Sequence, residues 1–501
     1  MMKGMIPETP DFAVSGSLAR ALKPLPRMEH QMTETKMTID PDIQTAFDRQ
    51  VAGVTERRRN FGLAERKDAL ARLADAIRNN EAAIVAALEQ DFGKPETETV
   101  LTEIIPVLQE IKHARRHLRG WMRPARVGLS LAAFGTSARV RPQARGVCLI
   151  IAPWNYPFIL AIGPLVSCLA AGNAAIIKPS EMTPATSALI ARLMAETFPP
   201  DLVCVVEGAV KTSEALLALP FDHIFFTGSP AVGKIVMAAA AKTLASVTLE
   251  LGGKSPAIIG PDADLKGAAD WIVFGKFSNA GQTCIAPDHL FVHASVKDAF
   301  LSLLRDRIAR AYGGDRAKAN LARIVNAHHA ERLAGLLEDA TNKGARVTQG
   351  GARDGTAFEP TLIEAMTPEM DIDREEIFGP ILPIITYDDP DAVIAQINAR
   401  PKPLSLYIFD RDGSRIDQII QQTSSGSVGV NLTMIQFIHN GLPFGGVNNS
   451  GLGSAHGHYG FRAFSHERAV MRNHFSVLPM IFAPYTTGVK RLIGIAKRIL
   501  G

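Results

Sequence analysis

The sequence predicts an α/β protein built from two doubly wound domains, each with a parallel sheet between layers of helices. Two series of short, β-rich runs alternate with helical stretches, one before and one after about residue 250. The chain has 501 residues, which is more than a single hydrophobic core supports. Apolar residues make up 47% of it and charged residues 21%, as in ordinary globular proteins.

The first predicted elements are helices. Residues 1–39 mix prolines, charges and methionines without a period, so we expect a disordered extension, not a signal peptide, and Met32 or Met37 could be the native start. Apolar residues then recur at helical spacing in two stretches: Leu70, Leu73, Ala74 and Ile77, and Leu101, Ile104, Ile105, Leu108 and Ile111. The second helix should end by residues 121–124, where a proline stops it.

The predicted strands follow in two series. The first comprises residues 146–153, 173–180, 201–208 and 223–229, and the second 255–262, 289–295, 381–387, 404–410 and 427–431. No charged residue lies between Gly146 and Ile177, but Pro153, Pro157 and the turn at 170–173 interrupt this stretch. Its longest clean apolar piece, 158–171, is shorter than the roughly 20 residues of a membrane-spanning helix, so we interpret it as core.

Charge and cysteine content exclude several classes of protein. The net charge of +4 is small for this length and gives no case for nucleic-acid binding. Four cysteines without a short repeated spacing predict neither a disulfide framework nor a zinc site, and no metal is expected. A reducing, cytoplasmic compartment fits this composition best.

One of the four cysteines stands apart from the others. Cys148, Cys168 and Cys204 lie in apolar runs, as buried cysteines do. Cys284 lies in "NAGQTCIAP" (279–287), whose Gly and Pro indicate a loop. Such a position favours a thiolate nucleophile, although a lone cysteine is more often inert packing.

Two strand ends carry candidate ligand-binding residues. In "FFTGSPAVGKIVMAAA" (225–240), Gly228 and Gly233 flank a turn from strand to helix, where a dinucleotide phosphate could bind, but a purely structural turn is equally compatible. Lys178 ends a strand in "IIKPSEMTP", and its amine and the Glu181 carboxylate could bind ribose hydroxyls, or simply be solvated.

Two further polar residues have alternative interpretations. Glu250 interrupts the apolar run of "VTLELGGKSP" (247–256), so it is either paired with a cation or has a raised pKa suited to proton abstraction. Asn155 of "APWNYP" could donate to an oxyanion or cap a helix.

Together these segments resemble the NAD(P)-dependent aldehyde dehydrogenase superfamily over about residues 40–480. The motifs occur in the order of that family: PWN at 153–155, KPSE at 178–181, FTGS…VG at 226–233, LELGGKSP at 249–256, GQTC at 281–284, EEIFGP at 375–380 and PFGG at 443–446. The sequences "AGQTCIAPD" and "HGHYGFRAFSHERAV" are similar to the class 3 branch, and "EIIPVLQEIKHARRHLRGWMRP" is similar to bacterial coniferyl aldehyde dehydrogenases.

The resemblance implies a role for each matching residue. Cys284 is the expected nucleophile, Asn155 and the Cys284 N–H hold the oxyanion, and Glu250 activates the water that hydrolyses a thioester. Tyr156 and Thr283 line the substrate tunnel. NAD is the expected cofactor, with NADP as a second option, because Glu181 disfavours a 2′-phosphate. The implied cofactor contacts are Trp154, Lys178, Glu181, Gly228, Ser229, Gly233, Leu251, Glu376 and Phe378.

The resemblance also implies domains and partners. We expect a Rossmann-like NAD-binding domain, a catalytic domain and a small β arm for oligomerisation in a homodimer, acting on an aromatic or long-chain aldehyde. The expected boundaries are 1–39 for the extension, 40–124 with 145–250 for NAD binding, 251–462 for catalysis, 125–144 with 463–480 for the arm, and 481–501 for a tail. An acylating, coenzyme A-dependent enzyme and a non-enzymatic relative are the alternatives.

Two regions depart from the family or extend it. Leu432, His439, Asn440, Gly441 and Asn448 differ from related enzymes near the expected tunnel mouth, which leaves the coniferyl substrate open. Residues 488–500 form a basic amphipathic helix that could lie on an anionic membrane or dock on the protein itself.

Overall fold

A computed structural model describes residues 41–128, 130–314 and 319–500. The predicted extension at 1–39 lies outside the described residues. No helix in the described part of the chain is long and apolar enough to cross a membrane.

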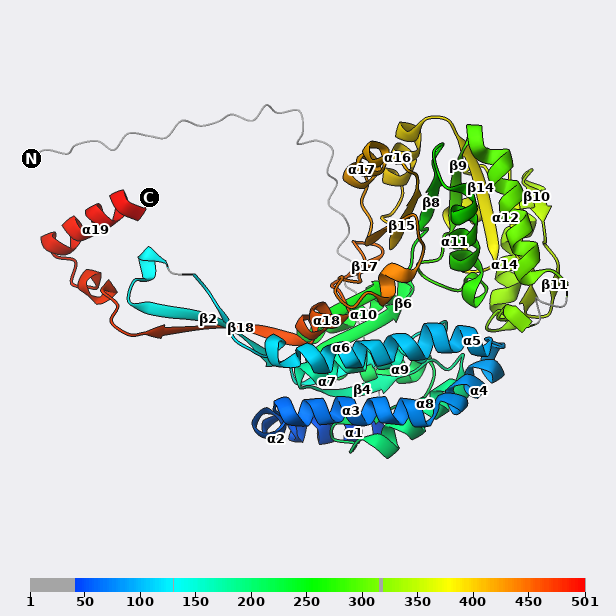
Figure 1. The fold of residues 1–501 in the computed structure, drawn as a ribbon. Helices are drawn as coiled ribbons and strands as arrows, with labels where there is room; N and C mark the ends of the chain where they lie inside the picture. The colour runs from blue at the N-terminus through cyan, green and yellow to red at the C-terminus, as the bar shows by residue number, and fades with distance from the viewer. Residues whose placement is uncertain (1–40, 129, 315–318, 501) are drawn as a thin grey trace, which may run out of the picture. The chain divides into compact units, whose positions relative to one another are not determined.

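The first sheet has six strands in the order β17-β7-β6-β3-β4-β5. Its strands β4, β6 and β17 are labelled in Figure 1. The strands β3 to β7 are parallel, and β17 is antiparallel to β7. Their bounds are Val147–Ile151 for β3, Ala174–Lys178 for β4, Val203–Val205 for β5, His223–Gly228 for β6, Ser246–Leu251 for β7 and Gly451–Leu452 for β17. All four predicted strands of the first series are therefore present, and β7 was not predicted.

Helices cover both faces of this sheet because its apolar side chains alternate between two clusters. Cys148 and Ile150 face one helical layer, and Val147 and Leu149 face the other. The first layer comprises α3 (Leu63–Asn79), α4 (Glu81–Phe92), α6 (Ile105–Trp121), α7 (Ile159–Ala171) and α8 (Pro184–Thr197), and the second α1 (Pro41–Ala52), α9 (Val210–Leu217) and α10 (Pro230–Thr243). The short α2 (Val54–Asn60) follows α1.

The predicted helical face at 101–111 is only partly buried. The chain continues from α5 (Glu96–Thr99) through a π-helix, η1 (Val100–Ile104), into α6. Ile104 and Ile111 are buried, but Leu101 is 54% exposed and Ile105 37%. Leu101 lies in the π-helix, and its side chain lines the apolar cavity described below.

The second sheet has seven strands in the order β10-β13-β14-β9-β8-β15-β16. Its strands β8, β9, β10, β14 and β15 are labelled in Figure 1. All pairings are parallel except that of β10 with β13. The strands are β8 (Pro256–Ile259), β9 (His289–His293), β10 (Arg346–Gln349), β13 (Thr361–Glu364), β14 (Ile381–Tyr387), β15 (Ser405–Phe409) and β16 (Ser427–Val430). One face packs on α11 (Leu265–Phe277), α12 (Lys297–Tyr312) and α14 (Ala327–Asn342), the other on α16 (Pro390–Asn398) and α17 (Gly413–Gln422). The two doubly wound sheets confirm the predicted fold class.

Smaller elements complete the chain. A three-stranded arm has the order β1-β2-β18, and β18 (Ser465–Asn473) pairs along its whole length with β2 (Thr136–Ala144). After β18 come η6 (Leu478–Ile481) and the C-terminal helix α19 (Thr487–Leu500). The remaining short elements are β1 (Ala125–Arg126), η2 (Leu131–Ala133), η3 (Ser278–Gly281), η4 (Ala294–Val296), β11 (Arg353–Asp354), β12 (Ala357–Phe358), α15 (Asp371–Arg374), η5 (Ile435–Ile438) and α18 (Gly457–Ala463).

Candidate active site

Two cavities meet at Cys284. The first, of about 220 Å³, lies at the carboxyl ends of β6 and β7, and the second, of about 230 Å³, has almost only apolar walls. Cys284 lines both. The predicted residues in the wall of the first cavity are Trp154, Asn155, Gly228, Ser229, Glu250, Leu251, Glu376 and Phe378, and those in the wall of the second are Tyr156 and Thr283.

The turn from β6 to α10 requires its glycines. A Cβ atom on Gly228 would lie 2.5 Å from the Phe226 ring, and one on Gly233 would lie 2.7 Å from Leu251 Cδ2. The Ser229 hydroxyl accepts the Val232 N–H at 3.4 Å and so begins the helix. The glycine at 233 lets the helix pack closely on β7, while the helix start at the cavity wall suits a phosphate group.

Lys178 and Glu181 lie outside the wall of this cavity. Lys178 ends β4 and is 3% exposed, and its Nζ forms an ion pair with Glu181 Oε2 at 2.6 Å. The sequence did not predict this pairing. Because the ammonium neutralises the carboxylate, Glu181 repels a neighbouring phosphate less than an unpaired carboxylate would.

Side chains from α14 and from Asp288 hold the loop with Glu376 and Phe378 in place by hydrogen bonds to its backbone. Arg332 of α14 donates to the carbonyls of Glu376 and Ile377, at 3.2 and 2.5 Å. The Ile377 N–H donates to Asp288 Oδ2 at 2.9 Å. Phe378 has a positive φ of 48°, and its ring lies 5.3 Å from that of Trp154. Neither Arg332 nor Asp288 was predicted, and a single sequence gave no signal for either.

Glu250 has a buried carboxyl group without a partner. Glu250 is 5% exposed, and neither of its side-chain oxygens accepts a hydrogen bond from the described residues. Burial raises the pKa of this carboxyl well above its usual range. The alternative of an ion pair is therefore wrong, and the raised pKa makes the carboxylate a better proton acceptor than an exposed one.

The loop before Cys284 has a strained backbone. Asn279, Ala280 and Gly281 have φ values of 54°, 52° and 73°, in the left-handed region. A Cβ atom on Gly281 would lie 2.3 Å from the Gly379 carbonyl oxygen, so only glycine fits there. Such strain persists only where the surroundings fix the conformation.

Hydrogen bonds fix this loop. Glu98 Oε1 accepts the Asn279 backbone N–H at 2.6 Å, and Asn279 Nδ2 donates to the Asn155 carbonyl at 2.7 Å. Gln282 Nε2 donates to the carbonyls of Asn279 and Arg323, both at 3.0 Å. Glu98 thus ties the helix before α6 to the cysteine loop, and burial raises the pKa of its carboxyl to about 7.

Asn155 belongs to the same network. Its Nδ2 donates one hydrogen bond, to the Gln282 carbonyl at 3.0 Å. The following helix α7 has Phe158 at its N-cap, without a side-chain cap. Helix capping by Asn155 is therefore wrong, and since an amide has two N–H donors, one is left to donate to a reacting group.

The thiol of Cys284 is disfavoured in its ionised form. Burial first, and then the nearby carboxyls of Glu376 and Glu250, raise its pKa to about 12. The other three cysteines lie elsewhere, in the first sheet and in α7, and all four are free.

The apolar cavity combines residues from distant segments. Tyr156 Oη and Thr283 Oγ1 are hydrogen-bonded at 2.9 Å, and Lys94 Nζ lies 3.9 Å from the centre of the Tyr156 ring. The other lining residues, which the sequence did not predict, are Leu101, Thr102, Ile159, Leu160, Phe274, Ile285, Met434, Ile435, Phe437 and Ile438. Leu432, His439, Asn440, Gly441 and Asn448 do not line it, although η5 lies between them in the sequence.

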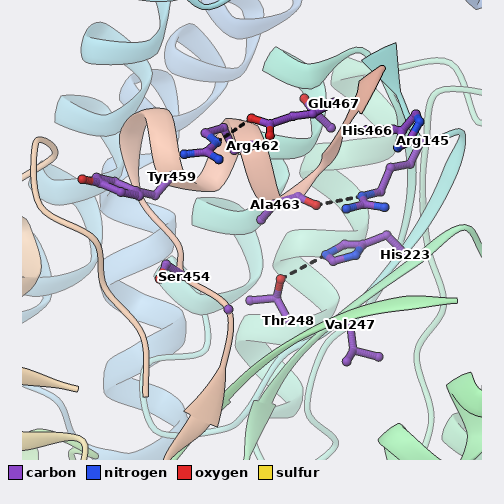
Figure 2. A pocket seen from close by; sticks show the side chains of 12 residues that line it. Arg145, His223, Val247, Thr248, Ser454, Tyr459, Arg462, Ala463, His466 and Glu467 are labelled. Carbon is purple, nitrogen blue, oxygen red and sulfur yellow. Dashed lines mark hydrogen bonds and ion pairs between the residues drawn. The ribbon is translucent and has the colours of Figure 1, made fainter. Parts of the chain in front are cut away.

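A third cavity, of about 480 Å³, lies beside α18 and the first residues of β18 (Figure 2). Arg145 Nε donates to a backbone carbonyl at 2.9 Å, Arg462 pairs with Glu467 at 2.8 Å, and His223 contacts Thr248 at 3.3 Å. No predicted site residue lines this cavity, and these side chains already have partners, so we assign it no ligand.

Comparisons with known proteins identify the family. The model of the aldehyde dehydrogenase family matches residues 23–470. The chain is 45% identical over 407 residues to 4,4'-diaponeurosporen-aldehyde dehydrogenase of Staphylococcus aureus, which covers 81% of this chain and 88% of that protein. It is 41% identical over 424 residues to a probable coniferyl aldehyde dehydrogenase of Pseudomonas aeruginosa, with 84% and 89% covered.

A solved structure agrees with these matches. The substrate-bound AldH of Staphylococcus aureus superposes with a TM-score of 0.86 at 41% identity and covers 90% of this chain and 99% of that one. Family 3 aldehyde dehydrogenases of Arabidopsis thaliana and Mus musculus are 39% and 42% identical to this chain. The predicted resemblance is confirmed: the chain belongs to the aldehyde dehydrogenase family and is an NAD(P)-dependent enzyme that oxidises an aldehyde to the acid.

Proposed function

We propose that Cys284 is the nucleophile of this oxidation and that the substrate is an apolar aldehyde, aromatic or long-chain. The observation that carries the proposal is the position of Cys284 in the wall of both cavities. A sulfur at this position faces an apolar space that fits an acyl chain and a second space whose glycine turn suits a dinucleotide.

The chain's own residues supply the polar chemistry. The Cys284 thiol loses its proton to water as its sulfur adds to the aldehyde carbon, and the resulting oxyanion accepts hydrogen bonds from the free Asn155 N–H and the Cys284 backbone N–H. Bound NAD(P)⁺ supplies the hydride acceptor. The thioester left on Cys284 is cleaved by a water that loses its proton to Glu250, which releases the carboxylate product and restores the thiol.

The residues around the first cavity fit the cofactor. The glycine turn and the start of α10 would hold the pyrophosphate, Glu376 and Phe378 the nicotinamide end, and Lys178 with Glu181 the adenosine ribose. Thr227 Oγ1 in the wall is buried and without a hydrogen-bond partner in the described chain, so it is available to a ligand. We propose that NAD is preferred over NADP because a 2′-phosphate would meet Glu181, by a margin that the Lys178–Glu181 ion pair reduces.

The relatives support the substrate class. Their names refer to a diaponeurosporen aldehyde and to coniferyl aldehyde. The test is kcat/KM across aliphatic, benzylic and cinnamyl aldehydes with NAD and with NADP. A rise with chain length or aromatic area supports the proposal, and a preference for small hydrophilic aldehydes contradicts it. Coenzyme A in the same assay distinguishes the acylating alternative, which forms an acyl thioester.

We also propose that the protein is a cytoplasmic homodimer with the predicted domain boundaries, except that β17 (Gly451–Leu452), within the predicted 251–462, belongs to the first sheet. The strands β16 and β18 are both sheet edges, which favour pairing with another chain. On α10, Val232, Ile235 and Met237 are exposed apolar side chains. Light scattering after gel filtration tests this proposal, with Ile235→Asp expected to shift the dimer towards monomer.

Peripheral membrane contact by the C-terminal tail is a separate proposal. It is argued from the charges and exposed side chains of the arm and tail, which lie outside both cavities. It is tested by lipid binding and not by enzyme activity.

A further inference from the structure

We infer that the segment 475–498 docks on the surface of an anionic lipid membrane. We call this segment, which comprises η6, α19 up to Arg498 and the residues before and between them, the C-terminal platform. The docking itself does not depend on the proposed function. Only its purpose does, since an enzyme on the membrane would have access to an apolar aldehyde dissolved in the lipid.

The charge of the arm and tail is one-sided. Residues 468–501 contain six Lys or Arg and no Asp or Glu, and residues 122–145, which include β1 and β2, contain five Arg and no acid. Because the whole chain has a net charge of +4, the remaining residues carry −7 (4 minus 11). The excess of positive charge therefore lies entirely in the arm and tail, where it would attract anionic lipid headgroups.

Large apolar side chains are exposed beside these cations. Phe475, Met480, Phe482 and Tyr485 are each at least 60% exposed. Among the described residues, this is a dense run of exposed aromatic and aliphatic groups within a single short segment. Exposed apolar patches of this kind mark interaction sites, and aromatic rings with nearby cations suit the interface of a membrane.

Helix α19 is amphipathic. At about 100° per residue, Val489, Leu492, Ile493 and Ala496 fall on one face, within about 100° of arc. Lys490 and Lys497 border this face, and Arg491 and Arg498 lie on the opposite side. Helices with basic polar faces and apolar opposite faces lie in the interfacial plane of anionic membranes.

The apolar face of α19 is not covered by the rest of the described chain. Leu492 and Ile493, on this face, are 40% and 42% exposed, and η6 is the main element that α19 contacts. The helix has 14 residues, or about 21 Å, which is less than the roughly 30 Å hydrocarbon core of a bilayer. The geometry therefore favours a helix that lies on the membrane and does not cross it.

A second copy of the chain is the competing occupant, because the rest of each chain is acidic. The two occupants predict different measurements. Membrane docking predicts binding that needs anionic lipid and falls with salt, without a change in oligomeric state. Docking on a second copy predicts that changes in the platform alter the oligomer and not the affinity for lipid.

The experiment is vesicle co-sedimentation of the full chain without cofactor or substrate. We expect binding to vesicles of equal parts phosphatidylcholine and phosphatidylglycerol, and none to phosphatidylcholine alone. Leu492→Asp with Ile493→Asp, and Lys490→Glu with Arg491→Glu, should each lower the lipid affinity about tenfold or more. The matched controls are Val210→Asp for an exposed apolar residue and Arg58→Glu with Arg59→Glu for an exposed basic pair, and both should bind like the wild type.

Folding and catalysis are checked in parallel. All variants should keep the wild-type Tm, oligomeric state and turnover of benzaldehyde, because the platform lies outside both active-site cavities. Absence of wild-type binding to anionic vesicles overturns the inference, and so does a platform variant that loses its oligomer but binds lipid normally. Since sedimentation needs no turnover, either outcome leaves the proposed chemistry of Cys284 intact.

Discussion

The two cavities on either side of Cys284 differ in how they are built. The first has the glycine turn, two raised-pKa carboxyls, Glu250 and Glu376, and walls from segments that carry a recognisable motif, apart from His329 and Arg332 of α14. The second is almost entirely apolar and combines η1, α7, α11 and η5, none of which carries a motif. The difference teaches that the reaction is specified by a few polar groups at strand ends, whereas the choice of aldehyde is specified by packing.

The largest expected effect removes the residue that the two cavities share. Cys284→Ala should lower turnover by at least about 10³-fold while NAD binding, measured by calorimetry, stays within twofold of the wild type. Cys204→Ala, which changes a partly buried cysteine on β5, is the matched control and should keep normal turnover. Near-normal turnover of Cys284→Ala would refute the proposed nucleophile.

The second effect concerns Glu250, in the first cavity, and separates formation of the thioester from its hydrolysis. Glu250→Gln should retain a single-turnover burst of NADH and lower steady turnover about 10²-fold or more, because the thioester forms but its hydrolysis lacks a base. Stopped-flow absorbance measures both phases. A lost burst together with a slow steady state would place Glu250 before the thioester and contradict its assigned role.

The third effect acts on the apolar cavity alone. Ile438→Glu places a charge in the apolar wall and should raise KM for decanal about tenfold, with little change for acetaldehyde. Ile420→Glu on α17 is the control, since Ile420 has a similar exposure, 39% against 41%. Equal effects of Ile438→Glu on both aldehydes would mean that this wall does not select the substrate.

The fourth effect concerns Glu376, in the first cavity, and its influence on the pKa of the Cys284 thiol. The pKa of the Cys284 thiol, about 12, lies above the usual value partly because of the Glu376 carboxyl. The rate of alkylation by iodoacetamide should therefore rise steadily with pH up to pH 10, and Glu376→Gln should increase it several-fold at a given pH. Glu375→Gln, in the exposed neighbour, should have no effect, and an equal increase in both variants would contradict this cause.

The smallest effect concerns Glu98, a positioning residue for the cysteine loop. Its folded-state pKa of about 7 exceeds the usual 4.5, so the folded state binds this proton more tightly and loses stability as pH rises from about 4.5 to about 7. Glu98→Gln keeps an acceptor for Asn279 but does not titrate. Its Tm should gain about 1–3 °C on the wild type across this window. A Tm difference independent of pH would contradict the assignment.

The sequence by itself determined the fold class, the family and most of the cofactor-side residues. Strand alternation predicted nine of the strands, because β-branched runs at this spacing have few other stable arrangements. Cys284, Glu250 and Asn155 could be singled out because each stands in a short motif with local chemistry. The glycine at the start of GQTC, Gly281, also belongs to such a motif. The structure gives the reason, since the left-handed turn before the cysteine tolerates no side chain.

Only the tertiary structure decided the rest. It brought Glu98 to Asn279 across 181 positions, placed Arg332 beneath the Glu376 loop and turned Leu101 towards a cavity. It also excluded a partner for Glu250 among the described residues and paired Lys178 with Glu181. The physical reason is that burial, pKa and the shape of an apolar wall depend on side chains from distant segments, which local sequence patterns do not bring together.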